Sequence, residues 1–170
     1  MIEGIDHVGI AVASIDEARK TYEALGLRVE SVEEVPAEGV RVAMIPCGAG
    51  RIELLEPTSP DSPVAKFLAR RGPGIHHLCL GSDDVAADDA RLRAAGLDVL
   101  RDAPTVGAGG HRVQFVHPRS TGGVLLELSQ EPVGGSGGPD SGEGSGVGTG
   151  AAAEATAATP AAEAAREGSR

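Results

Sequence analysis

The chain has 170 residues, with 25 acidic and 15 basic side chains and only three aromatic ones, Tyr22, Phe67 and Phe115. This acid excess excludes a protein built to cover nucleic acid phosphates, which needs clustered lysine and arginine. No apolar run approaches the roughly 18 residues of a membrane span, so we expect no membrane association either.

The composition changes near residue 133. From 133 to 170, 10 of 38 residues are glycine and 10 are alanine, and Val133 and Val147 are the only large aliphatic ones. Such a segment buries too little apolar surface to offset its ordering entropy, so we predict a disordered low-complexity tail over 133–170. Residues 1–132 then form one folded domain.

Two features of the sequence indicate a cytoplasmic protein. The N-terminus lacks a basic segment followed by an apolar one, so no signal peptide is predicted. Cys47 and Cys79 each lie in an apolar stretch. We expect both to be small buried hydrophobic residues in a reducing compartment, without a disulfide.

In chain order, the first half of the domain is predicted to be a strand, a helix and three strands. Ser14 and Glu17 have capping-box spacing, and Gly26 suits the helix end. A connecting helix follows over about 62–72, with Pro63 at its first position. The second half repeats the pattern. The predicted strands are 5–12, 27–32, 40–46, 51–55, 75–81, 97–101, 112–117 and 123–129, and the predicted helices are 14–25 and 84–95.

An internal repeat supports this division. Residues 4–10 align with 74–80 at an offset of 70, and 26–29 align with 96–99 at the same offset. Residues 52–54 resemble 126–128 at an offset of 74, a drift that a change of four residues in loop length explains. Three matches in the same order favour a duplication, with modules over about 1–58 and 74–131.

Four polar residues stand out in these apolar strands. His7 and His77 occupy equivalent first strands, and Glu53 and Glu127 occupy equivalent last strands. Any one of them alone could face water or be a hydrogen-bonded structural residue, because side chains alternate across a sheet. A two-fold repeat, however, brings equivalent strands together, and two imidazoles with two carboxylates suit a divalent cation of the Zn, Co, Mn, Ni or Fe group.

Two further histidines compete for a place in this site. His76 adjoins His77, and neighbours on a strand point to opposite faces, so we expect only one of them to enter. The repeat selects His77, because Asp6 aligns with His76. His117 ends a predicted strand, where a place in the pocket and a structural role are both open.

The chain resembles the vicinal oxygen chelate superfamily, which has the glyoxalase fold, and within it the methylmalonyl-CoA epimerases. The resemblance covers roughly 3–131 and rests on segments 6–12, 52–57, 59–68, 74–77 and 117–128. It implies an α+β fold in which paired βαβββ modules form a cupped mixed sheet around a metal site. The family ligands fall on His7, Glu53, His77 and Glu127.

The resemblance also implies an activity. It is the interconversion of (2R)- and (2S)-methylmalonyl-CoA, by proton abstraction next to the thioester with help from a divalent metal. Cobalt is favoured, with Mn²⁺, Ni²⁺ and Zn²⁺ as alternatives, and small proteins of this fold are often homodimers. Some members carry Gln in place of Glu53 and a catalytic Glu on the preceding strand. That strand has no acid here, so we assign the bases to Glu53 and Glu127.

The CoA portion of the substrate needs positive charge, for which Arg112, His117 and Arg119 are the candidate binding residues. Segment 107–110 is either a flexible loop that closes over the ligand or only a turn.

Two other functions are compatible with the sequence. A glyoxalase I-like lactoylglutathione lyase would use the same four ligands, whereas a metal-free binding module of this fold has no need of them. An extradiol dioxygenase is disfavoured, because its iron site uses two histidines and one carboxylate.

Overall fold

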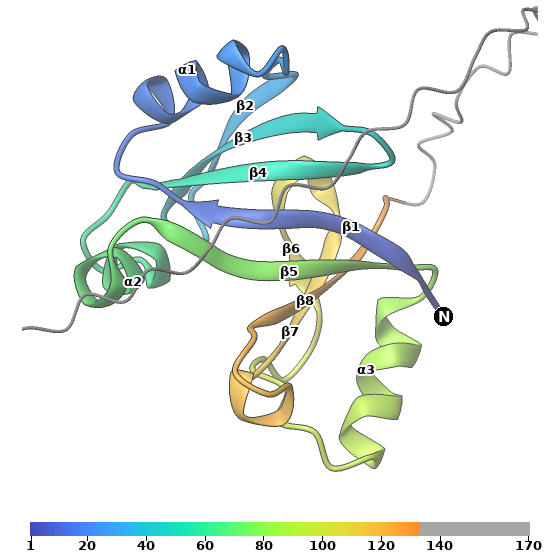
Figure 1. Ribbon diagram of the computed structural model, residues 1–170. Helices are drawn as coiled ribbons and strands as arrows, with labels where there is room; N and C mark the ends of the chain where they lie inside the picture. Colours follow the sequence, from blue (N-terminus) through green and yellow to red (C-terminus); the bar gives the residue numbers. More distant parts are fainter. Residues whose placement is uncertain (133–170) are drawn as a thin grey trace, which may run out of the picture. The chain divides into compact units, whose positions relative to one another are not determined.

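The computed structural model describes residues 1–132, and the tail predicted over 133–170 lies outside the described residues. This part of the chain has an α+β fold with one eight-stranded sheet and three α-helices. Figure 1 shows how the helices and strands are arranged. The elements are β1 (Ile2–Ala11), α1 (Ile15–Ala24), β2 (Ser31–Val35), β3 (Val40–Cys47), β4 (Gly50–Pro57), α2 (Pro63–Arg71), β5 (Gly74–Ser82), α3 (Val85–Ala94), β6 (Thr105–Val106), η1 (Ala108–Gly110), β7 (Arg112–Val116), η2 (Pro118–Ser120) and β8 (Leu126–Gln130).

The strand order shows how the two modules join. It is β2-β3-β4-β1-β5-β8-β7-β6, so each module contributes four neighbouring strands and the first strands, β1 and β5, pair antiparallel at the centre. Within each module the first strand pairs parallel with the last, β1 with β4 and β5 with β8. The remaining pairs are antiparallel, which makes the sheet mixed.

The two ends of the sheet are also connected. Near β2, Glu33 Oε1 accepts a hydrogen bond of 2.7 Å from the backbone N–H of Gly109 in η1, and Glu38 Oε1 accepts one of 2.6 Å from Arg101 Nη2. These contacts require the sheet to curl until its two outer regions meet. They also give segment 107–110 a structural role as a contact between the modules.

The helices α1 and α3 begin with related capping contacts. Ser14 Oγ accepts from Glu17 N, as the capping-box spacing predicts, and Asp84 caps α3 in the same way. The first helical N–H of each helix is also bound by its module's last strand: Ile15 N donates to Glu56 Oε2 at 2.6 Å, and Val85 N donates to Gln130 Oε1 at 3.1 Å. The repeat therefore extends to side chains that orient the helices.

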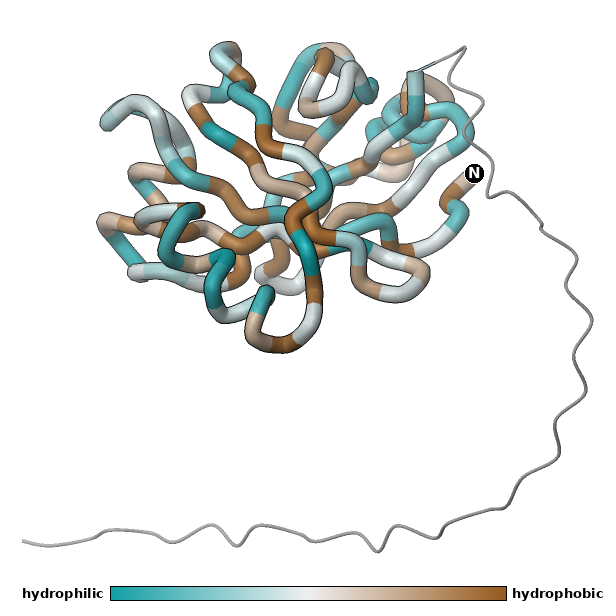
Figure 2. Tube along the Cα trace, turned by 90° about the horizontal axis from the view of Figure 1, so that it is seen from above, coloured by the Kyte–Doolittle hydropathy of each residue, from teal (hydrophilic) through white to brown (hydrophobic). Residues whose placement is uncertain are grey.

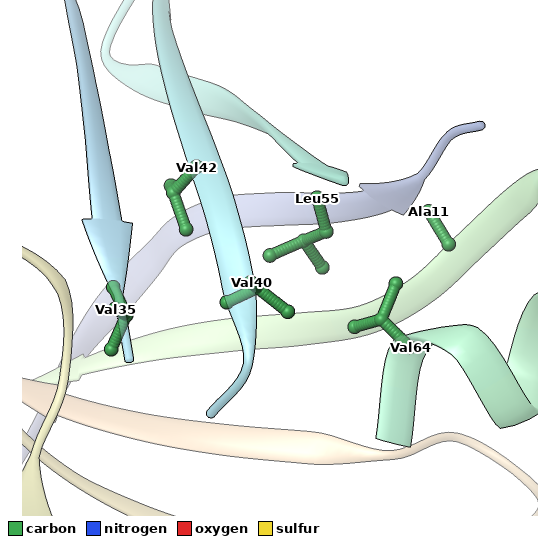
Figure 3. Close-up of a cluster of buried hydrophobic side chains, with 6 residues drawn as sticks. All are labelled: Ala11, Val35, Val40, Val42, Leu55 and Val64. Carbon is green, nitrogen blue, oxygen red and sulfur yellow. The ribbon is translucent and has the colours of Figure 1, made fainter. Parts of the chain in front are cut away.

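The apolar core is concentrated in the first module. Under α1, Ile15 packs with Ala43, Ile45 and Leu54, all fully buried. On the other face, side chains of β1–β4 converge with one from α2, as Figure 3 shows: Ala11, Val35, Val40, Val42, Leu55 and Val64. Figure 2 shows hydrophobic and hydrophilic segments alternating along the chain, as expected for strands that bury one side.

The helix α3 packs on its module mainly through polar groups. Gln114 of β7 is fully buried and donates to Asp89 Oδ1 at 2.9 Å and to the carbonyl of Arg101 at 3.0 Å. Asp88 accepts from Ser82 Oγ at 2.8 Å. None of the helices within residues 1–132 has the length and hydropathy needed to cross a bilayer.

Three predicted strands differ from the observed ones. Residues 27–30 are not a strand, because Leu27 and Val29 pack beneath α1 instead. In the predicted strand 97–101 only Val99 forms a bridge, and a short strand follows at β6, after Pro104, which has no N–H to donate. The strand predicted from 123 begins at Leu126.

The late start of β8 follows from Gly122 and Gly123, whose φ values of 69° and 100° form a turn. One burial prediction was also wrong. Cys47 is exposed, because it ends β3 just before a turn, whereas Cys79 is fully buried. Both thiols are free, as predicted.

Candidate metal centre and active site

The pairing register places the four candidate ligands around a local two-fold axis. His7 lies opposite Cys79 and Gly9 lies opposite His77, so the axis passes through the pair Val8–Leu78 between them. Glu53 pairs with Gly9, and Glu127 pairs with Cys79. In each module, therefore, the glutamate lies beside the residue two positions after the histidine.

The four side chains converge on one point. The two imidazole Nε2 atoms are 3.1 Å apart. Glu53 Oε2 lies 3.5 Å from His7 Nε2 and 3.4 Å from His77 Nε2, and Glu127 Oε2 lies 3.6 and 2.9 Å from the same two atoms. All four residues are buried.

This geometry fits a metal ion. Ligand atoms bonded to one ion at about 2.1 Å lie about 3 Å apart at adjacent octahedral positions and about 3.4 Å apart at tetrahedral ones. The five distances between 2.9 and 3.6 Å lie close to that range, and His7, His77 and Glu127 bring their donor atoms within 4.8 Å of one another. Two neutral imidazoles and two carboxylates would also neutralise a divalent charge, whereas an uncompensated pair of buried carboxylates would be costly.

Each candidate ligand histidine is held by the residue before it. His7 Nδ1 donates to Asp6 Oδ2 at 2.7 Å, and Arg51 in turn binds Asp6. His76 Nδ1 lies 3.0 Å from His77 Nδ1. Asp6 and His76 are equivalent in the repeat, and both are extra residues at breaks in the β1–β5 register, that is, β-bulges.

The bulge corrects the prediction that His76 points away from His77. Strand neighbours alternate only in a regular ladder, and at a bulge a side chain is redirected. His76 therefore lines the same cavity as His77 and packs against Phe67, with ring centroids 5.0 Å apart.

The charges within the cluster stabilise one another. Burial opposes the negative charge of Glu53, but the two imidazoles outweigh it and lower the pKa of Glu53 to about 2. Burial likewise opposes the positive charge of His77, and Glu127 and Glu53 outweigh it and raise its pKa to about 9. Burial and the charge of His77 lower the pKa of His76 to about 4, so His76 is neutral and accepts the Nδ1 proton of His77.

Gly9 is required by the position of the His77 ring. A Cβ on Gly9 would lie 2.2 Å from His77 Cε1, closer than any side chain tolerates. Its repeat counterpart Cys79 carries a side chain next to His7, so the two-fold relation is approximate here. Burial raises the pKa of the Cys79 thiol to about 12.

A largely apolar cavity of about 410 Å³ opens onto the cluster. Glu53, His77 and Glu127 line it together with β-strand side chains such as Val42 and Phe115. Glu38 and Arg101 line it as well, and Arg101 is its only lysine or arginine. Nothing in the sequence singled out Arg101, which has no counterpart in the repeat.

The three residues predicted to bind substrate do not line this cavity. Arg112 is exposed on β7, His117 caps η2 by accepting from Arg119 N at 3.1 Å, and Arg119 pairs with Asp98. They could contact only a part of a ligand that extends beyond the cavity, and their role stays a prediction.

Comparison with known proteins agrees with this architecture. Residues 6–115 match the family model of the glyoxalase/bleomycin resistance protein/dioxygenase superfamily. The chain belongs to that superfamily. It is 40% identical to the ethylmalonyl-CoA/methylmalonyl-CoA epimerase of Cereibacter sphaeroides over 133 residues, which cover 76% of this chain and 99% of the relative.

Two solved structures extend the comparison. One is a methylmalonyl-CoA epimerase in complex with methylmalonyl-CoA and NH4+, and the other is a variant of the Streptomyces coelicolor methylmalonyl-CoA epimerase in complex with 2-nitronate-propionyl-CoA. Each is 41% identical to this chain with a TM-score of 0.76, and each comparison covers 78% of this chain and 97% of the other.

Proposed function

We propose that the protein is a methylmalonyl-CoA epimerase, an isomerase that interconverts the (2R) and (2S) forms of methylmalonyl-CoA. The observation that carries this proposal is the buried, two-fold related cluster, of which Glu53, His77 and Glu127 line an apolar cavity. The relatives at 40–41% identity that are named for this activity support it.

We propose His7, Glu53, His77 and Glu127 as the ligands of a divalent cation. Bound there, such a cation would supply a Lewis acid for the thioester oxygen next to the reacting carbon. The resemblance favours cobalt, and the donor set also suits Mn²⁺, Ni²⁺ and Zn²⁺. Metal analysis of the purified protein, followed by titration of the stripped protein with each ion, tests this choice.

Epimerisation removes a proton from one face of C2 and returns one to the other, so two bases on opposite faces suit it best. Glu53 and Glu127 come from opposite modules and are related by the local axis. We propose that one carboxylate takes the proton from one face of C2 while the other relays a proton from solvent to the opposite face. In the alternative, both glutamates are ligands only and a water molecule moves the proton.

Glu53→Gln and Glu127→Gln separate these alternatives, because an amide oxygen can still ligate but the side chain no longer accepts a proton. We expect each variant to keep its metal and to lose at least about 100-fold in epimerisation rate. Deuterium exchange from solvent, followed for each epimer separately, should fail for the face that the substituted residue serves. A variant with the full wild-type rate would remove that residue from the base role.

Assaying the wild-type protein with methylmalonyl-CoA and with the glutathione hemithioacetal of methylglyoxal distinguishes the epimerase from a lactoylglutathione lyase. A protein that holds no stoichiometric metal and is inactive on both substrates would instead be a binding module.

We also propose a homodimer in the cytoplasm. The exposed apolar side chains of Ile5 and Ile75, equivalent in the repeat and 62% and 69% accessible, support a second copy. The free thiols support a reducing compartment. Light scattering tests the first proposal, since one chain has a mass of 17.1 kDa.

A further inference from the structure

Arg101 is the one lysine or arginine among the residues that line the substrate cavity. Of the three carboxylates that line it, Glu53 and Glu127 belong to the proposed metal site, and Glu38 lies beside Arg101. Residues 1–132 as a whole carry 20 acids and 13 bases. A CoA thioester has several phosphates, so it must enter a negatively charged protein, and a cation inside the cavity is the group best placed to receive it.

Arg101 is held in the cavity wall by contacts from both modules. Its Nη2 donates to Glu38 Oε1 at 2.6 Å, and its Nη1 donates to Thr105 Oγ1. The guanidinium carbon lies 5.0 Å from the centroid of the Phe115 ring. The guanidinium has five N–H donors and uses one each for Glu38 and Thr105, so donors remain for a ligand.

The contacts of Arg101 indicate which part of a ligand it meets. Phe115 lies near both Arg101 and His77, with its ring centroid 5.0 Å from the guanidinium carbon and 6.1 Å from the centroid of the His77 ring. In the proposed function the acyl group is held at the metal cluster, whereas the guanidinium is held by Glu38 and Thr105, which are not part of that cluster. Arg101 is therefore available to the CoA arm, which shares the cavity with the acyl group.

We propose that Arg101 is a specificity-determining residue that binds an acceptor oxygen of the CoA arm, a pantetheine carbonyl or a phosphate. Glu38 holds the guanidinium over Phe115 and thereby orients the free donors toward the cavity. Arg101 and Glu38 are only 25% and 26% exposed, so their contact is shielded from solvent and the donors are preorganised. This inference rests on the proposed epimerase function.

The test compares two variants that break the same ion pair. Arg101→Gln removes the guanidinium, whereas Glu38→Gln keeps it. We expect Arg101→Gln to raise the KM for methylmalonyl-CoA about tenfold, the factor that corresponds to 1.4 kcal/mol, with little change in kcat. Glu38→Gln should raise KM clearly less than Arg101→Gln does, because the guanidinium remains and the amide oxygen can still accept from it.

A shortened substrate separates binding from a structural effect. The S-ethyl thioester of methylmalonate has no CoA arm, so Arg101→Gln should leave its kcat/KM unchanged. The methylmalonyl thioester of pantetheine then identifies the acceptor. If Arg101→Gln also raises the KM for the pantetheine thioester, the acceptor is a pantetheine carbonyl. If it raises the KM only for methylmalonyl-CoA, the acceptor is a phosphate.

Two results would overturn the inference: an equal rise in KM for both variants, or a loss with the S-ethyl thioester as large as that with methylmalonyl-CoA. Either would show that the ion pair only stabilises the cavity. A wild-type protein without epimerase activity would instead contradict the proposed function. In that case, calorimetric titration of the wild type and Arg101→Gln with propionyl-CoA still measures the contact.

Discussion

At the scale of single residues, the two histidines proposed as metal ligands, His7 and His77, differ in the residue that contacts their Nδ1 atoms. Asp6 gives His7 a carboxylate partner, whereas His76 gives His77 a neutral imidazole. A carboxylate behind a ligating imidazole fixes its orientation and strengthens it as a donor. The two halves of the site therefore hold their ligands with unequal strength, although their backbones are related by a two-fold axis.

Asp6→Asn tests this difference. The amide can still accept from His7 but carries no charge, so we expect the affinity of the stripped protein for its metal to fall about 10- to 100-fold. Competition titration against a chelating dye measures the change. Asp61→Asn, an exposed acid far along the chain, serves as the control. Equal affinities for wild type and Asp6→Asn would show that Asp6 serves only to bind Arg51.

Gly9→Ala tests the packing of the His77 ring. The added methyl group would lie 2.2 Å from that ring, so the ring must move and the metal site must lose one ligand. We expect metal stoichiometry to fall well below that of the wild type. The same substitution at Gly74, on the paired strand, meets nothing within 4 Å and should leave metal content unchanged. Full metal content in Gly9→Ala would mean that the ring has room to shift.

At the scale of elements, the ends of the sheet orient the helices. Glu56 and Gln130 follow Glu53 and Glu127, the proposed bases of their modules, by three residues and bind the first N–H of α1 and α3. A side chain in this position satisfies one of the unpaired donors at a helix start. The position of each helix is therefore set by the strand that also carries a ligand.

Glu56→Ala should lower the free energy of unfolding by about 1 kcal/mol, the usual cost of losing an N-terminal helix cap. Gln130→Ala should act similarly, and the two effects should add, because the residues serve different helices. Urea denaturation measures both, with the exposed Glu34→Ala as control. If Glu56→Ala were as stable as that control, Ser14 alone would suffice to cap α1.

The sequence predicted the elements whose ends are marked by capping residues or proline, and it missed those that depend on tertiary contacts. Ser14, Gly26 and Pro63 mark helix ends through local chemistry, and those helices lie where expected within two residues. The repeat located the four clustered side chains, because symmetry makes equivalent positions meet. The bulges at Asp6 and His76, and the reach of Arg101 to Glu38, arise only when strands distant in sequence pair, so no local pattern indicated them.

At the scale of the whole molecule, the buried cluster links stability to pH. The pKa of His77 is raised from 6.5 to about 9. The contribution of His77 to the free energy of unfolding is therefore complete below pH 6.5 and is lost as the pH rises through 9. The pKa of Glu53 is lowered from 4.5 to about 2. The contribution of Glu53 to the free energy of unfolding is therefore complete above pH 4.5 and is lost as the pH falls through 2. Both contributions are complete between pH 4.5 and 6.5.

We therefore expect the metal-free protein to lose stability as the pH rises from 6.5 to 9. Urea denaturation of chelator-treated protein at several pH values measures this loss, and His77→Asn should show less of it. Metal-loaded protein should instead gain stability as the pH rises. A metal ion competes with protons for the same imidazoles, so it binds more tightly when the imidazoles lose their protons. A metal-free protein that gains stability over this range would contradict the assignment.

The boundary between β1 and β5 divides the proposed ligand set equally, with one histidine and one glutamate on each side. Each module alone has only two of the four proposed ligands, so it should bind a metal ion more weakly than the intact domain does. The affinity for the ion therefore reports whether the two modules are packed together. By mass action, a tightly bound ion stabilises the docked arrangement over any separated one. If the chain were cut within α2, two inert fragments should recover a metal centre only by complementing each other. An enzyme descended from a duplication would thus have an active site that belongs to neither copy.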